Sequence, residues 1–127
     1  MASLEWFKNV DLDLQIRILI QGYVDVTYDR FGKTYMSQLT CENSKLNFKF
    51  WSNKKNKKEL ESLREKIKSD AIIKRLPGSL SSLTDFGYGN MCYPSFYLEI
   101  RLNELNKQEK EQLFGYFALK GYDKYIE

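Results

Sequence analysis

The sequence contains no histidine and only two cysteines among its 127 residues. Histidine is the commonest general base and a common metal ligand, so its absence excludes Ser-His-Asp and Cys-His catalysis and zinc sites that need histidine. Two thiols cannot complete an all-cysteine zinc site either. No apolar run approaches the length of a membrane-spanning helix. The sequence also lacks phosphate-loop, dinucleotide-loop and hydrolase motifs, so we predict a protein that is not an enzyme and has no cofactor.

An acidic pair, Asp11 and Asp13, raises the question of a metal site. On one face of a strand, two carboxylates at this spacing project about 7 Å apart, which suits one Mg²⁺ or Ca²⁺ ion. No glycine-containing ligand loop accompanies them, and acidic residues are also common at strand edges. We therefore predict no metal.

The two cysteines, Cys41 and Cys92, stand singly in apolar, strand-like surroundings. This pattern is typical of buried thiols in a reducing compartment, and a disulfide between them is the alternative. The first residues, MASLEWFKNVD, lack a basic segment followed by an apolar one, so we expect no secretory signal. The expected location is the cytoplasm.

The composition, 43% hydrophobic and 15% aromatic, is that of a folded chain with a real core. Its length predicts a single domain over residues 1–127. Residues 12–28 show the strongest alternation of apolar and polar side chains, which predicts a long strand kinked at Gly22. A turn at residues 29–32 and further alternation predict strands at 33–42, 46–51 and 96–101.

Two helices are predicted, over residues 56–70 and 106–121, with a loop at 79–90. Asn56 with Glu59 fits a capping box, and Gly121 fits the position after a helix end. Shifting the chain by fifty residues aligns both strand–helix segments without gaps. We therefore predict an α+β fold with two layers, a mostly antiparallel sheet of about four to six strands and two main helices on one face.

Positive charge is concentrated in residues 43–76, which hold 11 basic and four acidic side chains, a net charge of +7. The rest of the chain holds nine basic and 13 acidic side chains. A local field of this kind steers anionic partners. Its densest part is Lys54, Lys55, Lys57 and Lys58, of which we place the first two in a loop and the last two at a helix start.

The predicted solvent face of the sheet carries Tyr23, Trp51 and Tyr97 together with Lys49. Aromatic anchors inside a polar rim are typical of protein interfaces, although an ordinary solvent face with a few aromatics has the same composition. The face could also stack bases, but the aspartates of the predicted first strand would repel a polyanion there.

These patterns together predict a small, non-catalytic binding protein of the inhibitor type, such as a toxin-immunity or phage anti-defence protein. Its lysine-rich edge would steer it to a protein partner with an acidic or nucleic-acid-binding surface. The alternative is a nucleic-acid-binding regulator that uses the same basic edge. The partner-binding residues predicted are Tyr23, Lys49, Trp51, Lys54, Lys55, Lys57, Lys58 and Tyr97.

Overall fold

The computed structural model describes residues 4–28, 34–86 and 93–125. The chain forms two compact units: residues 1–30 with 104–127, called here the helical unit, and residues 31–103, called the sheet unit. The single domain expected from the length stays a prediction.

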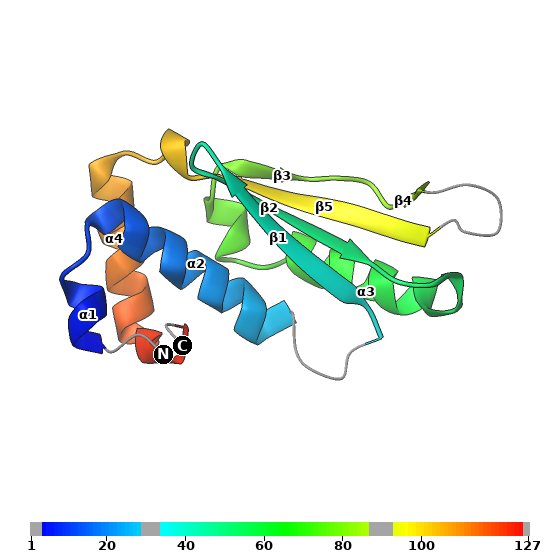
Figure 1. Ribbon diagram of the computed structural model, residues 1–127, viewed down its shortest axis with the longest axis horizontal. Helices are drawn as coiled ribbons and strands as arrows, with labels where there is room; N and C mark the ends of the chain where they lie inside the picture. Colours follow the sequence, from blue (N-terminus) through cyan, green and yellow to red (C-terminus); the bar gives the residue numbers. More distant parts are fainter. Residues whose placement is uncertain (1–3, 29–33, 87–92, 126–127) are drawn as a thin grey trace. The chain divides into compact units, whose positions relative to one another are not determined.

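The sheet unit contains a five-stranded antiparallel sheet with β2 and β5 at its centre (Figure 1). The strands pair in the order β1-β2-β5-β3, and β4 pairs with the same strand as β3. In chain order the elements are β1 (Met36–Glu42), β2 (Lys45–Trp51), η1 (Lys54–Asn56), α3 (Lys57–Lys68), η2 (Ile73–Arg75), β3 (Gly78–Leu80), β4 (Thr84–Phe86) and β5 (Tyr93–Arg101), with η4 (Leu102–Glu104) at the boundary between the units.

The predicted α+β class is confirmed, and five strands fall within the predicted range. β1, β2 and β5 lie where alternation predicts strands, and α3 lies where a helix is predicted. The turn between β1 and β2 consists of Asn43 and Ser44, whose φ angles of 53° and 63° are both positive. Two such residues make the tight hairpin turn that suits the twist of paired strands.

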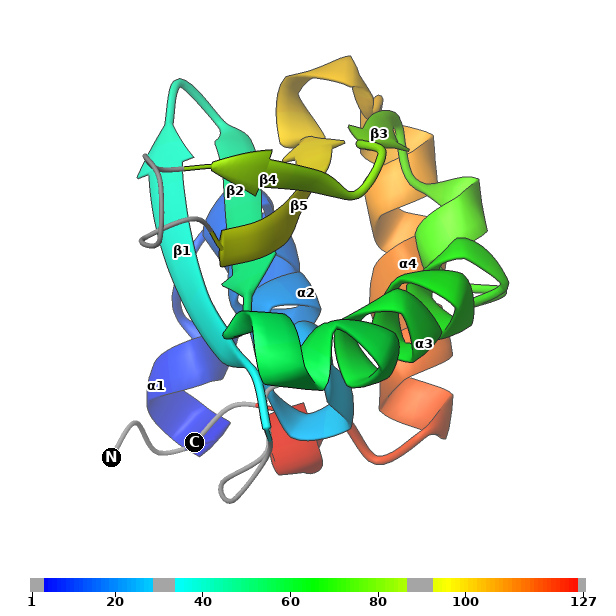
Figure 2. The same ribbon diagram turned by 90° about the vertical axis from the view of Figure 1, so that its right-hand side faces the viewer.

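The core of the sheet unit lies between the sheet and α3, which runs along one side of the sheet (Figures 1 and 2). Period-two alternation places the apolar side chains of each central strand on this inner face. At most 2% of each is exposed, whereas the helix residues Leu60, Leu63 and Ile67 are at most 5% exposed. The inner-face residues of the central strands are Leu46, Phe48, Phe50, Phe96, Leu98 and Ile100.

The two central strands are related by the fifty-residue shift. Phe48 pairs with Leu98 at the middle of the β2–β5 ladder. These two residues are fifty positions apart, so the shift that aligns the two segments in sequence also aligns the centres of two strands that pair with each other. Leu46 accordingly faces Ile100, and Phe50 faces Phe96.

The described residues of the helical unit form four helices, among them the second predicted helix, α4. Its core is aromatic: the ring centroids of Phe7 and Tyr122 lie 5.6 Å apart, and those of Phe117 and Tyr125 lie 5.7 Å apart. Within the described part of the chain, no helix is long and apolar enough to cross a membrane. The helices of this unit are α1 (Leu4–Lys8), α2 (Leu12–Tyr28), α4 (Lys107–Leu119) and η5 (Tyr122–Tyr125).

The prediction of a long strand over residues 12–28 is wrong, because these residues form α2. The buried residues recur every three or four positions, as on one face of a helix. Leu19, the aliphatic residue that breaks the alternation, is one of them and is fully buried. Asp11 begins the helix, since its Oδ1 accepts a hydrogen bond from Leu14 N at 2.9 Å. The buried residues are Ile16, Leu19, Ile20, Val24 and Tyr28. The predicted pair of main helices thus becomes three.

The presence of glycine at position 22 is explained by close packing of two helices. A Cβ atom added to it would lie 1.8 Å from the carbonyl oxygen of Tyr125, so the glycine allows η5 to lie directly against α2. It does not kink a strand.

Three smaller predictions are also wrong. The predicted loop at 79–90 includes β3 and β4, which are too short for their alternation to be recognised. Asn56 makes no side-chain capping bond, because η1 precedes α3 and Asn53 caps that turn instead. Cys41 is a free thiol and is exposed on β1 rather than buried. Cys92 and the predicted turn at 29–32 lie outside the described residues.

Gly121 is confirmed as the residue that follows the end of α4. Its φ angle is 72°, the left-handed conformation that favours glycine, and its N–H donates to Ala118 O at 3.2 Å.

Candidate functional site

The outer face of the sheet is the face away from α3, and strand register fixes which side chains share it. Trp51 lies between Met36 of β1 and Ser95 of β5, whereas Lys49 lies between Gln38 and Tyr97. Lys49, Trp51 and Tyr97 are therefore brought together, as predicted from the alternation. The outer-face residues of these strands are Met36, Gln38, Thr40, Glu42, Lys45, Asn47, Lys49, Trp51, Ser95, Tyr97, Glu99 and Arg101.

Large apolar side chains are exposed at one end of the outer face. Met36 is 52% exposed and Tyr97 is 40% exposed, while Trp51 beside Met36 is half-buried. Lys49 Nζ lies 5.2 Å from the centre of the Trp51 ring. Such a cation–π contact contributes about 0.5–1 kcal/mol at an exposed site and holds the ring in a defined orientation.

The charges of the outer face are mixed. The basic residues are Lys45, Lys49 and Arg101, and the acidic residues are Glu42 and Glu99. Arg101 Nη1 lies 2.7 Å from Glu99 Oε1. The prediction of an acidic excess on this face is wrong. It counted Asp11, Asp13, Asp25 and Asp29 together with Glu99, but Asp11 caps α2, and Asp13 and Asp25 lie on α2 in the helical unit. Asp29 lies outside the described residues.

The lysine segment, defined as Lys54, Lys55, Lys57 and Lys58, follows the outer face along the chain. All four side chains are exposed. None has an ion-pair partner among the described residues, so their charges are presented to solvent. Within the part of the chain that the structure describes, the neighbouring Glu59 and Glu61 form no salt bridge with these lysines.

The placement of Lys54 and Lys55 in a loop is wrong. Asn53 Oδ1 accepts a hydrogen bond from Asn56 N at 3.1 Å, which makes Asn53 the cap of the helical stretch. Lys57 N in turn donates to Lys54 O, so η1 continues into α3. All four lysines thus occupy the first turns after the cap, where the helix dipole disfavours cations.

Ser52 fixes the lysine segment at the end of the outer face. It is 1% exposed, and its N–H donates to Pro94 O of β5 at 3.2 Å. Its hydroxyl donates to Asn53 O at 2.9 Å. Because Ser52 directly follows Trp51 and directly precedes the cap residue, the lysines start from a rigid point beside the exposed aromatic residues.

Tyr23 does not belong to this surface, contrary to the prediction. It lies on α2 and packs in the helical unit, with its ring centroid 6.0 Å from that of Phe117 and 5.7 Å from that of Tyr125. The alternation misplaces it because residues 12–28 are helical.

The two units differ in the sign of their charge. The sheet unit holds 13 basic and seven acidic residues, a net charge of +6, whereas the helical unit holds seven basic and ten acidic residues, a net charge of −3. The outer face and the lysine segment therefore belong to the unit that carries all of the excess positive charge.

Asp11 and Asp13 have structural partners. Asp11 caps α2, and Asp13 Oδ1 lies 2.5 Å from Lys110 Nζ of α4. Across residues 4–28, 34–86 and 93–125, no group of three or more Cys, Asp or Glu side chains is arranged to hold a metal ion.

Comparisons of this chain with protein-family models, with curated proteins and with solved structures find no match.

Proposed function

We propose that this protein is a small, non-catalytic protein-binding module, and that its contact surface is the outer face of the sheet together with the lysine segment. The observation that carries the proposal is the placement of exposed Met36 and Tyr97, half-buried Trp51 and four exposed lysines at one end of one unit. Aromatic and methionine anchors surrounded by charged side chains are the composition that protein interfaces favour.

The two parts of the surface have different roles in this proposal. The lysine segment attracts an acidic surface, or a protein surface that itself binds nucleic acid, and so raises the association rate. Trp51 and Tyr97 supply the apolar contacts that slow dissociation. A partner whose functional surface is covered in this way is inhibited, which supports an inhibitor of the toxin-immunity or anti-defence type.

The proposal is tested by affinity capture followed by mass spectrometry, with nuclease treatment of the sample. The wild-type chain is compared with a Trp51→Ala, Tyr97→Ala variant and with a variant in which all four lysines of the lysine segment are replaced by Glu. The control is Lys66→Glu, Lys68→Glu, which removes two exposed lysines at the other end of α3.

The expected result is one partner that resists nuclease, is captured by the control and is lost with both surface variants. With the purified partner, the lysine variant should mainly lower the association rate and its salt dependence, and the aromatic variant should mainly raise the dissociation rate. Capture that is the same for all variants would refute this surface.

The nucleic-acid-binding alternative is favoured by one observation: Asp13 and Asp25, two of the acidic residues expected on the sheet, lie instead on α2. However, Lys49 already covers the Trp51 ring, so a base could stack there only after displacing it. A filter-binding titration decides between the two functions, because nucleic-acid binding weakens linearly in the logarithm of the salt concentration. Retention of nucleic acid at low salt with this slope, together with its loss in the lysine variant, would establish the alternative.

A further inference from the structure

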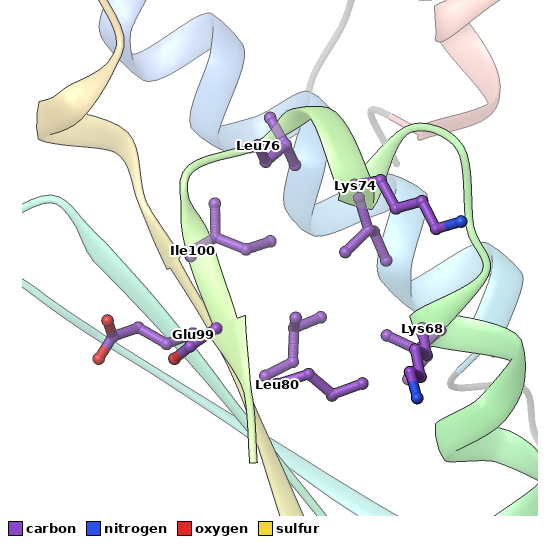
Figure 3. A pocket seen from close by; sticks show the side chains of 11 residues that line it. Lys68, Lys74, Leu76, Leu80, Glu99 and Ile100 are labelled. Carbon is purple, nitrogen blue, oxygen red and sulfur yellow. The ribbon is translucent and has the colours of Figure 1, made fainter.

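A cavity lies in the sheet unit, on the side of the sheet that α3 covers. Its volume is about 180 Å³, and it lies between the end of α3, η2 and the pairing of β3 with β5. Its walls are mainly aliphatic (Figure 3). The apolar lining residues are Ile67, Ile73, Leu76, Leu80, Leu98 and Ile100.

Hydrogen bonds hold each wall in place. Asp70 Oδ1 accepts from Ile72 N at 2.8 Å and from Ile73 N at 3.0 Å, which fixes the turn into η2. Arg64 Nε donates to Ser81 O at 2.7 Å and ties α3 to the end of β3. The cavity is therefore formed before any ligand arrives, which lowers the entropic cost of binding.

Gly78 allows the third wall to form. A Cβ atom at this position would lie 2.0 Å from Glu99 O, so only glycine lets β3 start its pairing with β5 here. Arg101 N also donates to Pro77 O at 2.7 Å, just before the strand.

The mouth of the cavity is positively charged. Lys68 and Lys74 lie on the same side of it, and both are exposed (Figure 3). Neither has an ion-pair partner among the described residues. The one acidic residue in the lining, Glu99, directs its carboxylate away to the outer face (Figure 3). An anion at the mouth therefore has two lysine side chains on one side of the cavity, and the carboxylate in the lining points away from it.

The size of the cavity limits its ligand. An engineered apolar cavity of about 150 Å³ accepts benzene, a six-carbon molecule, whereas drug-sized sites are about 300–1,000 Å³. The cavity here, at about 180 Å³, therefore accommodates an apolar group of about six carbons.

We propose that this cavity binds a small monocarboxylate, with its short aliphatic tail among the apolar walls and its carboxylate between Lys68 and Lys74. The proposal does not depend on the protein-binding function, because the lysine segment, Trp51 and Tyr97 do not line the cavity, and Glu99, the outer-face residue that does, directs its carboxylate away from it.

The test uses hexanoate and the full chain labelled with ¹⁵N, followed by NMR. The expected result is saturable movement of the amide signals of Ile67, Ile73 and Leu80, with a Kd on the order of 1 mM. Hexan-1-ol has the same tail without the charge, acetate has the charge without the tail, and hexylammonium has the opposite charge. All three should bind more weakly than hexanoate.

Two variants separate the tail from the carboxylate. Lys68→Gln with Lys74→Gln should weaken hexanoate binding roughly twofold to thirtyfold and leave hexan-1-ol binding unchanged. Leu80→Trp, on a short edge strand, should fill the cavity and abolish binding of both. The matched control, Lys54→Gln with Lys55→Gln, removes the same charge elsewhere in the unit and should leave the Kd unchanged.

Several results would overturn the proposal. They are the absence of saturable movement with hexanoate, equal affinity for hexanoate and hexylammonium, and signals that move at the lysine segment instead of the cavity. Unchanged hexanoate affinity in the Lys68 and Lys74 variant would also overturn it, provided that its amide spectrum remains that of the folded protein.

Discussion

The connection from β2 to α3 and the connection from β5 to α4 have the same length and each contains a short 3-10 helix, yet only one is crowded with lysines. The last inner-face residue of the strand before each connection, Phe50 in β2 and Ile100 in β5, is at most 1% exposed. The helices that follow begin at Lys57 and Lys107, fifty residues apart. The lysines are thus carried by one of two otherwise similar connections.

The two connections satisfy the start of the helix in different ways. At α4, Asn106 Oδ1 accepts from Glu109 N at 2.8 Å, and Glu109 Oε1 accepts from Asn106 N at 3.0 Å, a complete capping box. At α3, the cap is Asn53, three residues before Asn56, the position equivalent to Asn106. No acidic residue lies between Asn53 and Glu59. Both helices place a glutamate in the first turn, Glu59 in α3 and Glu109 in α4, where the dipole favours it, but only Glu109 completes a capping box. The lysines at α3 therefore serve something other than the helix start.

The largest expected loss of stability tests whether the inner-face residues before the two connections contribute equally to the core. Phe50→Ala should lower the free energy of unfolding by about 3–5 kcal/mol and Ile100→Ala by about 2–5 kcal/mol, because each removes a buried side chain from the core. Chemical denaturation measures both. The control Tyr97→Ala, on the outer face, should cost about 1 kcal/mol or less. A small loss for one inner-face variant and a large loss for the other would break the equivalence of the connections.

The sheet unit was predictable because its strands are amphipathic and its turn residues are distinctive. Leu46, Phe48 and Phe50 alternate with polar residues, and Asn43 with Ser44 marks the hairpin, so register and faces follow. Residues 12–28 fit both a strand and a helix, because even positions are apolar and so are positions three or four apart. Packing in the helical unit, which brings η5 against Gly22, decides between them, and no local pattern carries that contact.

The candidate surface was predictable to the same extent. Lys49, Trp51 and Tyr97 share a face because strand alternation places them there, whereas Tyr23 was misplaced together with its helix. The cavity was not predicted at all. Its walls come from four elements, including the three-residue strand β3, and only the tertiary structure brings Ile67, Ile73 and Leu80 together.

A smaller loss of stability tests whether the helix cap before α3 lies at Asn53 and not at Asn56. Asn106→Ala and Asn53→Ala should each lower the free energy of unfolding by about 0.5–2 kcal/mol, because each removes a side-chain acceptor from a helix start. Asn56→Ala, at the position equivalent to Asn106, should cost almost nothing, because its side chain makes no capping bond. Thermal unfolding of the three variants measures the order. A loss for Asn56→Ala as large as that for Asn106→Ala would show that both helices are capped at equivalent positions.

The smallest expected change in the free energy of unfolding is that of glutamate substitutions in the lysine segment, and its sign is informative. Lys54→Glu and Lys55→Glu should each raise the free energy of unfolding by about 0.3–1 kcal/mol at low salt, because they place acids after the cap at the positive end of the helix dipole. At about 1 M salt the gain should vanish through screening. The control Lys66→Glu, in the last turn of α3, should lower stability instead, since cations are favoured there.

The sign matters because it separates a structural role of the lysines from a functional one. If both substitutions in the first turns stabilise the protein and also slow its association with the partner, the lysines are kept at a cost in stability for the contact they make. If those substitutions destabilise the protein as the control does, the lysines contribute to the fold, and the contrast between the two connections no longer points to a binding surface.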